Sequence, residues 1–263
     1  MMIHTLGPAG TSSYDAALEL FPRSSIELAA NFDALFQMLE AGNAIGFVPI
    51  ENSVHGSVDE VIDLLVESGL KMWKTFDVSI HCAFGALDGK KVTKIASHPQ
   101  ALVQCRPYLK KHYPKAEYFP VSSTAFAIEL GLTDKTIGVI ARASTMRERG
   151  LPVITPEIQR KGNTTRFAIV SAKDPFPDSM RTHMSIALHP LPTEDRPGLL
   201  HQLLTPFKIY DINLTRIENR PTGKRLGDYI FFLDFIGSSE DGRTKKALAE
   251  LSSLAAVQVL GEW

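Results

Sequence analysis

The first two thirds of the chain repeats one unit, in which a short apolar run is followed by a polar turn and a helix-like stretch. The first unit has an apolar run at residues 3–6, the turn GPAGTSS and a helix predicted over residues 12–20. A second helix is predicted from Asn31, a suitable N-cap, and a third from Ser57, with which Glu60 completes a capping box. Apolar runs that alternate with helices in this way indicate an α/β fold.

A long and mostly extended run over residues 71–87 interrupts this repeat and is suited to crossing from one lobe to another. Beyond it the repeat resumes, with helices predicted over residues 99–109, 124–130 and 144–149. The turns GPAGT, ENS, SHPQ and SST each place hydroxyl or amide side chains near the start of a helix. Free backbone N–H groups at helix N-termini attract anions, so these turns predict an anion-binding cleft.

The pattern changes after residues 173–178, KDPFPD, whose two prolines and flanking charges are typical of a linker. A strand in HMSIALHP is followed by a helix in DRPGLLHQLLTPF, where Asp195 and Pro197 suit a helix start. Two strands joined by the turn PTGKRLG, a helix over residues 241–254 and a last apolar run complete the chain. The resulting order, β-α-β-β-α-β, is ferredoxin-like.

Composition narrows the possible partners and compartments. A length of 263 residues suggests two domains. The 28 basic and 29 acidic residues nearly cancel, so neither a nucleic-acid nor a membrane partner is expected. Cys82 and Cys105 are too few for a disulfide framework, and we expect them to be small buried side chains in a reducing, cytoplasmic compartment. We see no signal-peptide pattern and no segment suited to spanning a bilayer.

The stretch KGNTTRFAIV, residues 161–170, leads from a polar turn into an apolar strand. Thr164 and Thr165 point to opposite faces of an extended chain, so only one can face a cleft. Taken alone, the stretch is most simply a strand of β-forming threonines, with Arg166 as a surface charge. Beside the four anion-attracting turns, however, Arg166 becomes a candidate fixed cation in the cleft.

These features together suit a small polyanion such as a di- or tricarboxylate. Each charge-assisted hydrogen bond in such a cleft contributes about 1.5–3 kcal/mol. Glu51, at the end of an apolar strand, either lies at the cleft or caps a helix, and we do not assign it as a general acid. Glycine-rich dinucleotide motifs, a P-loop lysine and H-E-x-x-H or C-x-x-C spacings are missing from the sequence, so neither a cofactor nor a metal is expected. Whether the anion is only bound or also converted stays open.

Several motifs resemble, in order and spacing, those of the prephenate dehydratase family, whose members convert prephenate to phenylpyruvate with loss of water and carbon dioxide. They are GPAGTSS, the block FDALFQMLEAGNAIGFVPIENSVHGSV, SHPQALVQC, SST and NTTRF. RPGLLHQLL and RIENRP are similar to the two phenylalanine-binding motifs of the ACT regulatory domain that follows in this family. The resemblance covers nearly the whole chain and implies the α/β, type II periplasmic-binding-protein-like fold, two lobes around a cleft, followed by a ferredoxin-like ACT domain.

The resemblance also implies domain boundaries. The catalytic domain would span residues 1–176, with lobe one at about 1–76 plus 165–176 and lobe two at about 77–164. The crossings between the lobes would be residues 71–82 and the stretch before Thr165. The ACT domain would span residues 182–263.

The family's functional residues can be carried over to this sequence. The catalytic positions are Thr165, Asn52, Ser97 and Gln104. The candidates for substrate binding are Arg166, Thr11, Glu51, Thr124 and Phe167. The phenylalanine-binding positions are Gly198, Leu199, Leu200, Glu218, Asn219, Arg220 and Pro221. Thr165 would hydrogen-bond the leaving hydroxyl, and Arg166 with helix N-terminal amides would hold a carboxylate.

The resemblance implies regulation by phenylalanine, bound between two ACT domains, and therefore a homodimer or homotetramer. The sequence departs from the family at Leu199 and His201, where alanine and valine are usual, and at Asn219, where serine is usual. The larger Leu199 is expected to narrow the phenylalanine pocket. Ser12 stands where an aromatic residue is usual, and His55 is a further departure in the ENS loop.

Other functions remain open at the sequence level. An arogenate dehydratase would use the same machinery, because arogenate differs by an amino group on the side chain. A non-aromatising prephenate decarboxylase is disfavoured, because it would not need the threonine of NTTRF. A non-catalytic amino-acid sensor would not need the leaving-group donor. Chorismate mutase activity is not expected, since an all-helical segment does not precede GPAGT.

Overall fold

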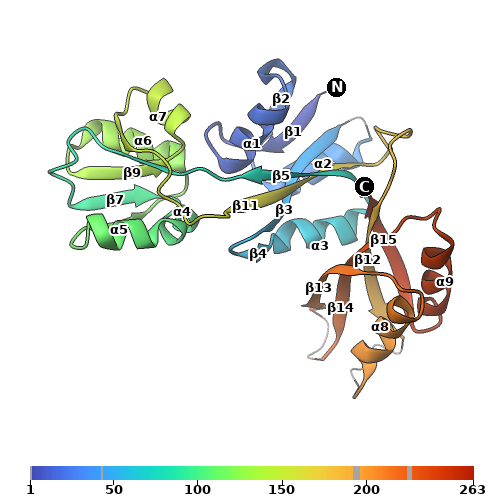
Figure 1. Ribbon diagram of the computed structural model, residues 1–263. Helices are drawn as coiled ribbons and strands as arrows, with labels where there is room; N and C mark the ends of the chain where they lie inside the picture. The colour runs from blue at the N-terminus through green and yellow to red at the C-terminus, as the bar shows by residue number, and fades with distance from the viewer. Residues whose placement is uncertain (1, 43, 192–195, 224–226) are drawn as a thin grey trace. The chain divides into compact units, whose positions relative to one another are not determined.

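The structure, a computed structural model, describes residues 2–42, 44–191, 196–223 and 227–263 (Figure 1). Its chain divides into two compact units. The first unit comprises Met1–Leu35, Ile45–Val61 and Phe76–Phe167, and the second comprises Phe36–Ala44, Ile62–Thr75 and Ala168–Trp263. No helix in these described ranges is long and apolar enough to cross a bilayer.

The first unit contains two sheets, which form two lobes. In the first sheet, β1 (Ile3–Leu6) pairs in parallel with both β2 (Ile26–Ala29) and β3 (Ile45–Asn52). The strand order continues from β3 to β11 (Thr164–Ser171) and then to β5 (Lys71–Ser79), and the short β4 (Gly56–Ser57) pairs with the end of β3. The helices that accompany this sheet are α1 (Ser12–Leu20), α2 (Phe32–Glu40) and α3 (Asp59–Ser68), with a 3-10 turn at Arg23–Ser25.

Aromatic side chains pack this first lobe. The rings of Phe47 on β3 and Phe167 on β11 are stacked with their centroids 4.6 Å apart, and both side chains are fully buried. Phe21 and Phe76 meet Phe47 edge to face. Because β3 and β11 are neighbours in the sheet, this packing holds the end of β3 beside the start of β11.

The second sheet of this unit has the order β10-β6-β9-β7-β8. Different helices cover its two faces (Figure 1). Neighbouring residues of β9 point to opposite faces, so Ile140 packs in one cluster with Leu109 of α5, and Val139 packs in another with Ile128 of α6. The strands are β6 (Ala83–Gly85), β7 (Lys94–Ser97), β8 (Glu117–Pro120), β9 (Ile137–Ala141) and β10 (Val153–Thr155). The helices are α4 (Pro99–Gln104), α5 (Arg106–His112), α6 (Thr124–Thr133) and α7 (Ala143–Glu148).

Two chain crossings connect the sheets, residues 80–82 between β5 and β6 and residues 156–163 between β10 and β11. They run side by side, because the Ile80 N–H donates to the Asn163 carbonyl at 2.8 Å. The Cys82 N–H donates to Gln159 Oε1 at 2.9 Å. Hydrogen bonds therefore join the two crossings at both ends of residues 80–82.

The helices of this unit follow the sequence prediction with two differences. The helix predicted over residues 12–20 is confirmed as α1. The helix predicted from Ser57 begins instead at Asp59, because Ser57 pairs with Glu51 in the β3–β4 hairpin. The single helix predicted over residues 99–109 is two helices, α4 and α5, which meet at Cys105. Pro107 explains the break, because proline cannot donate the backbone hydrogen bond that a continuous helix needs at this position.

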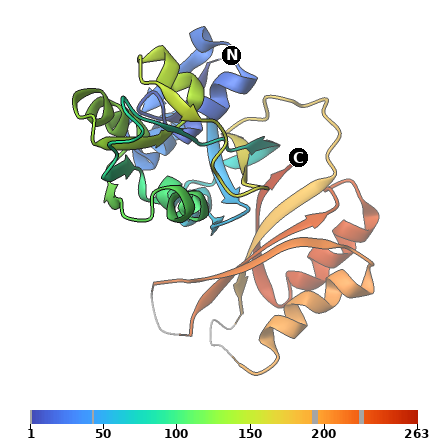
Figure 2. The same cartoon turned by 60° about the vertical axis from the view of Figure 1, so that its left-hand side comes forward.

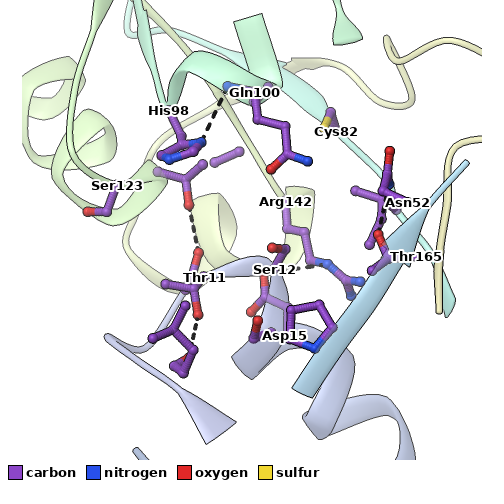
Figure 3. Close-up of a pocket in the computed structure, with 18 of the residues that line it drawn as sticks. Thr11, Ser12, Asp15, Asn52, Cys82, His98, Gln100, Ser123, Arg142 and Thr165 are labelled. Atoms are coloured by element: carbon purple, nitrogen blue, oxygen red, sulfur yellow. Dashed lines mark hydrogen bonds and ion pairs between the residues drawn. The ribbon is translucent and has the colours of Figure 1, made fainter. Parts of the chain in front are cut away.

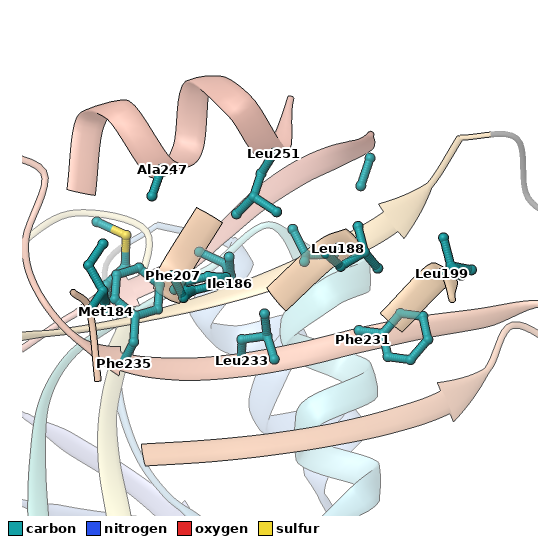
Figure 4. Close-up of a cluster of buried hydrophobic side chains, with 13 residues drawn as sticks. Met184, Ile186, Leu188, Leu199, Phe207, Phe231, Leu233, Phe235, Ala247 and Leu251 are labelled. Carbon is teal, nitrogen blue, oxygen red and sulfur yellow. The ribbon is translucent and has the colours of Figure 1, made fainter. Parts of the chain in front are cut away.

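The second unit contains four antiparallel strands of order β13-β14-β12-β15, and the sheet continues from β15 to β5. Its two helices lie side by side on one face of the sheet (Figure 2). Phe207 of one helix and Ala247 and Leu251 of the other pack on strand residues such as Ile186 (Figure 4). Leu203 belongs to the same cluster. The elements are β12 (His183–Pro190), α8 (Leu199–Ile209), β13 (Leu214–Pro221), β14 (Tyr229–Ile236), α9 (Gly242–Leu251) and β15 (Ala255–Glu262).

The element order of this unit confirms the predicted β-α-β-β-α-β arrangement. Its first helix has Gly198 as N-cap, with φ of 82°, so α8 starts two residues after Pro197; Asp195 lies outside the described residues. With the two-sheet lobes of the first unit, the expected fold class is confirmed: an α/β, type II periplasmic-binding-protein-like part followed by a ferredoxin-like part.

The second unit also includes parts of α3 and β5, which contact the ferredoxin-like sheet. Met72 of β5 pairs in parallel with Gly261 of β15. A Cβ atom on Gly261 would lie 2.2 Å from the Met72 carbonyl oxygen, so only glycine allows this approach. From α3, Asp63 forms an ion pair with Arg220, and the Val66 carbonyl accepts from Gln258 Nε2 at 2.9 Å.

Candidate active site

The first unit holds a pocket of about 390 Å³ into which the predicted anion-attracting turns all project (Figure 3). Gly10 and Thr11 come from GPAGT, Asn52 from ENS, His98 and Gln100 from SHPQ, and Ser123 and Thr124 from SST. Three of the turns begin helices at the carboxyl ends of parallel strands, which is where an α/β fold brings helix N-termini together. The four turns that the sequence pattern singled out therefore meet at one pocket.

Polar side chains in these turns are oriented by their own helices. Thr11 caps α1, since its Oγ1 accepts from the Tyr14 N–H at 3.3 Å and donates to the Leu6 carbonyl at 2.9 Å. Ser123 caps α6 in the same way, accepting from the Phe126 N–H at 3.1 Å. The Thr124 hydroxyl donates to the Gly10 carbonyl at 2.6 Å, which ties the SST turn to the GPAGT turn.

His98 presents a neutral imidazole to the pocket. Its Nδ1 accepts from the Gln100 N–H at 3.3 Å, so the ring proton is on Nε2. Burial lowers the pKa of His98, which favours the neutral form. His98 can therefore act as a hydrogen-bond donor near neutral pH, although the sequence pattern gave no reason to select it.

The side chain of Asn52 joins the ENS loop to β11 through hydrogen bonds. Its side chain is buried, and its Nδ2 donates to Thr165 Oγ1 at 2.9 Å and to Asn163 Oδ1 at 3.0 Å. Its Oδ1 accepts from the backbone N–H groups of Val54 and His55, at 3.0 and 3.1 Å. These contacts hold one rotamer of the Asn52 amide, because each polar atom has partners that the flipped amide would lose.

The Thr165 hydroxyl lies at the pocket with its oxygen already engaged as an acceptor. A threonine hydroxyl has one proton to donate, and among the described residues no acceptor takes that proton. The Asn52 amide therefore leaves Thr165 free to donate into the pocket. Gln104 lines the same wall, and its Nε2 lies 3.4 Å from Asn163 Oδ1.

Four of the residues expected at the site lie elsewhere. The Ser97 hydroxyl is fully buried and donates to the Ile140 carbonyl at 2.7 Å, so it joins β7 to β9 beneath the pocket. Phe167 belongs to the aromatic core. Arg166 and Glu51 lie outside the pocket lining, and Arg166 forms a forked ion pair with Asp77, at 2.7 and 2.9 Å.

The alternation along β11 explains the position of Arg166. Thr165 and Arg166 are neighbours on a strand, so their side chains leave it on opposite faces. Thr165 is on the pocket face and Arg166 is on the outer face, where Glu51 also approaches it, at 3.6 Å. The Arg166 guanidinium hydrogen bonds hold the pKa of Asp77 below its ordinary value. The positive charge of Arg166 is therefore shared with carboxylates outside the pocket.

A different arginine lines the pocket. Arg142 directly follows β9, and its guanidinium reaches two carboxylates of α1, with Nε 3.4 Å from Asp15 Oδ2 and Nη1 2.5 Å from Glu19 Oε1. Sequence reasoning did not select Arg142. A signal was available, because Arg142 occupies the junction of an apolar strand and a helix, as the polar turns do.

Asp15 is an unusual carboxyl group. It is 7% exposed, and this burial raises its pKa to about 6, even though Arg142 favours the ionised form. Glu19 and Glu148 add to the rise through like-charge repulsion. The described residues contain no group of three histidine, cysteine, aspartate or glutamate side chains that could hold a metal ion.

The two sequence motifs expected to bind phenylalanine lie near each other in the second unit. Leu199 and Phe231 belong to one buried cluster (Figure 4). Phe231 is also the cross-strand partner of Asn219. Leu200 is exposed, next to Leu199 at the start of α8. Burial alternates along β13, so Glu218 and Arg220 lie on one face and Asn219 and Pro221 on the other. Arg220 is therefore directed to α3, where its Nη2 and the Asp63 carboxylate are 2.6 Å apart.

The fold and the pocket define a class of protein: a two-lobed α/β part, whose pocket carries hydroxyl and amide donors, followed by a ferredoxin-like regulatory domain. The sequence pattern of the family described as prephenate dehydratase matches residues 3–175, and that of the ACT domain matches residues 193–253. The chain belongs to the prephenate dehydratase family and carries an ACT domain.

Individual relatives agree with this assignment. A prephenate dehydratase of Methanocaldococcus jannaschii is 34% identical, over 91% of this chain and 89% of its own length. A bifunctional chorismate mutase/prephenate dehydratase of Aquifex aeolicus is 34% identical, over 98% of this chain and 72% of its own length. The crystal structure of a prephenate dehydratase from Arthrobacter aurescens in complex with L-Phe is 32% identical, with a TM-score of 0.85 over 100% of this chain and 89% of its own.

Proposed function

We propose that this protein catalyses the decarboxylative dehydration of prephenate to phenylpyruvate, in the biosynthesis of phenylalanine. The observation that carries the proposal is the hydrogen bond from Asn52 Nδ2 to Thr165 Oγ1, which leaves the Thr165 proton directed to the pocket. The family assignment supports the same reaction. A sensor that only binds its ligand would not need this donor.

The reaction asks for a proton donor at one end of the substrate ring. The ring carboxylate leaves as carbon dioxide, its bonding electron pair enters the ring, and the hydroxyl at the opposite carbon leaves with a proton as water. The ring becomes aromatic, which supplies a large driving force. In this proposal Thr165 donates a hydrogen bond to the departing oxygen and passes on the proton that it needs from solvent, while Asn52 stabilises the Thr165 oxygen.

The remaining pocket residues orient the substrate in this proposal. Gln104 and Asn163 keep the Asn52 amide in place. Thr11, Thr124 and the neutral His98 line the pocket around the substrate ring and its side chain. Ser97 acts indirectly, because its hydroxyl secures the end of β7, which His98 directly follows.

We further propose the expected domain organisation, with residues 1–176 as the catalytic domain and residues 182–263 as the ACT domain. Phenylalanine would bind at Gly198–Leu200 and Glu218–Pro221 and inhibit the reaction, in line with the L-Phe complex of the Arthrobacter relative. Binding between two ACT domains would require a homodimer or homotetramer. A cytoplasmic location, based on the use of cysteine, stays a prediction.

The test is the appearance of phenylpyruvate from prephenate, followed by its ultraviolet absorbance with and without phenylalanine. Turnover that phenylalanine suppresses is the expected result. Turnover of arogenate but not of prephenate would assign the alternative dehydratase. If neither compound is converted while phenylalanine still binds, the sensor alternative holds and the proposed reaction is rejected.

A further inference from the structure

The pocket contains one permanent positive charge. Among its described lining residues, Arg142 is the only arginine or lysine. The proposed substrate carries two carboxylates, and Arg166 lies outside the pocket. On the basis of the proposed function, we propose that Arg142 is the anion-binding residue of the active site, and that Asp15 takes up a proton when a substrate carboxylate binds to Arg142.

The guanidinium of Arg142 is held in one orientation by the carboxylates of Asp15 (Figure 3) and Glu19. These contacts use Nε and Nη1. The remaining nitrogen, Nη2, is buried and has no hydrogen-bond partner among the described residues. A buried N–H group without a partner is unfavourable, so we expect a carboxylate that binds at the exposed part of the Arg142 side chain to draw the guanidinium towards it and to satisfy Nη2. The planar fork of an arginine suits a carboxylate in particular.

Asp15 adjusts the charge that an anion meets. The ionised Asp15 and Glu19 together outweigh the single positive charge of Arg142, and this excess opposes a dianion. Protonation of Asp15 removes this excess negative charge. The charged groups that face Asp15 are Arg142 at the β9–α7 junction, Glu148 on α7, and Glu19 on α1 itself. The pKa of Asp15 is already raised to about 6 in the unliganded pocket.

The proton is taken up because a bound carboxylate adds negative charge beside Asp15. The added charge raises the pKa of Asp15 further, so the complex holds more of the protonated form than the free protein does at the same pH. By linkage, binding is favoured where Asp15 is protonated and weakens as the pH rises above the pKa in the free protein. The wild-type kcat/KM for prephenate should therefore fall by about tenfold between pH 6 and pH 7.5.

A purely structural role for Arg142 makes different predictions. If Arg142 only braced α1 against the β9–α7 junction, its removal would lower stability and leave the KM unchanged. Asp15 would then have no effect on the pH profile. Kinetics and thermal unfolding of the same variants separate the two roles.

The experiment uses the full chain with Arg142→Gln, Arg142→Lys and Asp15→Asn. Arg149→Gln is the matched control, because Arg149 also pairs with a glutamate in this lobe, Glu129, but does not line the pocket. We expect Arg142→Gln to raise the KM for prephenate about tenfold or more, with lysine restoring part of the loss and the control unchanged. Asp15→Asn should flatten the fall in kcat/KM above pH 6.

Calorimetry with phenylpyruvate gives a readout that is independent of turnover. Titrations at pH 6.5 in phosphate and in imidazole should reveal uptake of about half a proton by the wild type and none by Asp15→Asn. A KM of folded Arg142→Gln within twofold of wild type, or equal proton uptake in Asp15→Asn, overturns the inference. A wild type that leaves prephenate unconverted rejects the proposed function instead.

Discussion

Replacing Thr165 with valine removes the hydroxyl group and keeps the branched shape of the side chain. The hydroxyl is the donor that the proposed reaction needs at the leaving oxygen, and its own oxygen is held by Asn52 at 2.9 Å. Loss of one such pre-oriented donor typically lowers kcat by about 10²–10³-fold, or about 2.7–4 kcal/mol of transition-state stabilisation. We expect a loss of this size in Thr165→Val.

The same substitution should cost little stability. Asn52 Nδ2 loses one acceptor but keeps Asn163 Oδ1 at 3.0 Å and the Thr164 carbonyl at 3.3 Å. One lost neutral hydrogen bond then corresponds to about 1 kcal/mol, which lowers the Tm of a domain of this size by about 2–4 °C. The effect on turnover is thus predicted to be far larger than the effect on folding.

The assay is steady-state formation of phenylpyruvate, with circular dichroism to follow thermal unfolding. Thr165→Ser is the matched control, since it keeps the hydroxyl and should retain kcat within about tenfold of wild type. A Thr165→Val enzyme with kcat within threefold of wild type would refute the proposed role of this hydroxyl. An equal drop in kcat in Thr165→Ser, which keeps the hydroxyl, would refute it as well.

Three further predictions concern residues outside the pocket. Arg166→Gln should leave the KM and kcat for prephenate within about threefold, because an exposed ion pair contributes only about 0–1 kcal/mol; a tenfold rise in KM would contradict its placement. Asp63→Asn removes the carboxylate that holds Arg220, so it should shift the phenylalanine concentration for half-inhibition at least about threefold at unchanged basal kcat. An unchanged inhibition curve would exclude this ion pair from regulation. Gly261→Ala should lower the free energy of unfolding in urea by about 1–3 kcal/mol, because its Cβ atom would clash with the Met72 carbonyl. The control Gly242→Ala has open space around it and should change the free energy of unfolding by less than about 1 kcal/mol. Equal effects of the two substitutions would contradict the steric argument.

Most of the fold could be predicted from the sequence alone. Alternation of apolar runs with helix starts predicted the α/β part, and the β-α-β-β-α-β order of the second part was also correct. Both succeed because secondary structure and its order depend on local periodicity and capping. The differences were local as well, at Ser57 and at Cys105, where strand pairing and a proline shifted the helix ends.

Part of the site could also be predicted. Thr165, Asn52 and Gln104 belong to motifs at strand ends or on a helix facing the sheet edge, and the structure brings all three to one pocket. Polar turns after parallel strands meet at one edge of a sheet whatever the details of packing. The turn residues Thr11 and Thr124 lie at the pocket for the same reason.

The position of the positive charge was decided only by tertiary structure. Strand alternation says that Thr165 and Arg166 diverge, but not which of them faces the pocket, because that depends on the lobe packed against β11. Arg142 pairs with Glu19, which lies 123 residues away in the sequence. Neither residue lies in a local sequence pattern that predicts this contact. The contact of Arg142 with Asp15 joins α1, beside the first sheet, to the end of β9 in the second sheet. Periodicity therefore determined which side chains share a strand or a helix face, whereas the long-range packing determined which charge faces the pocket.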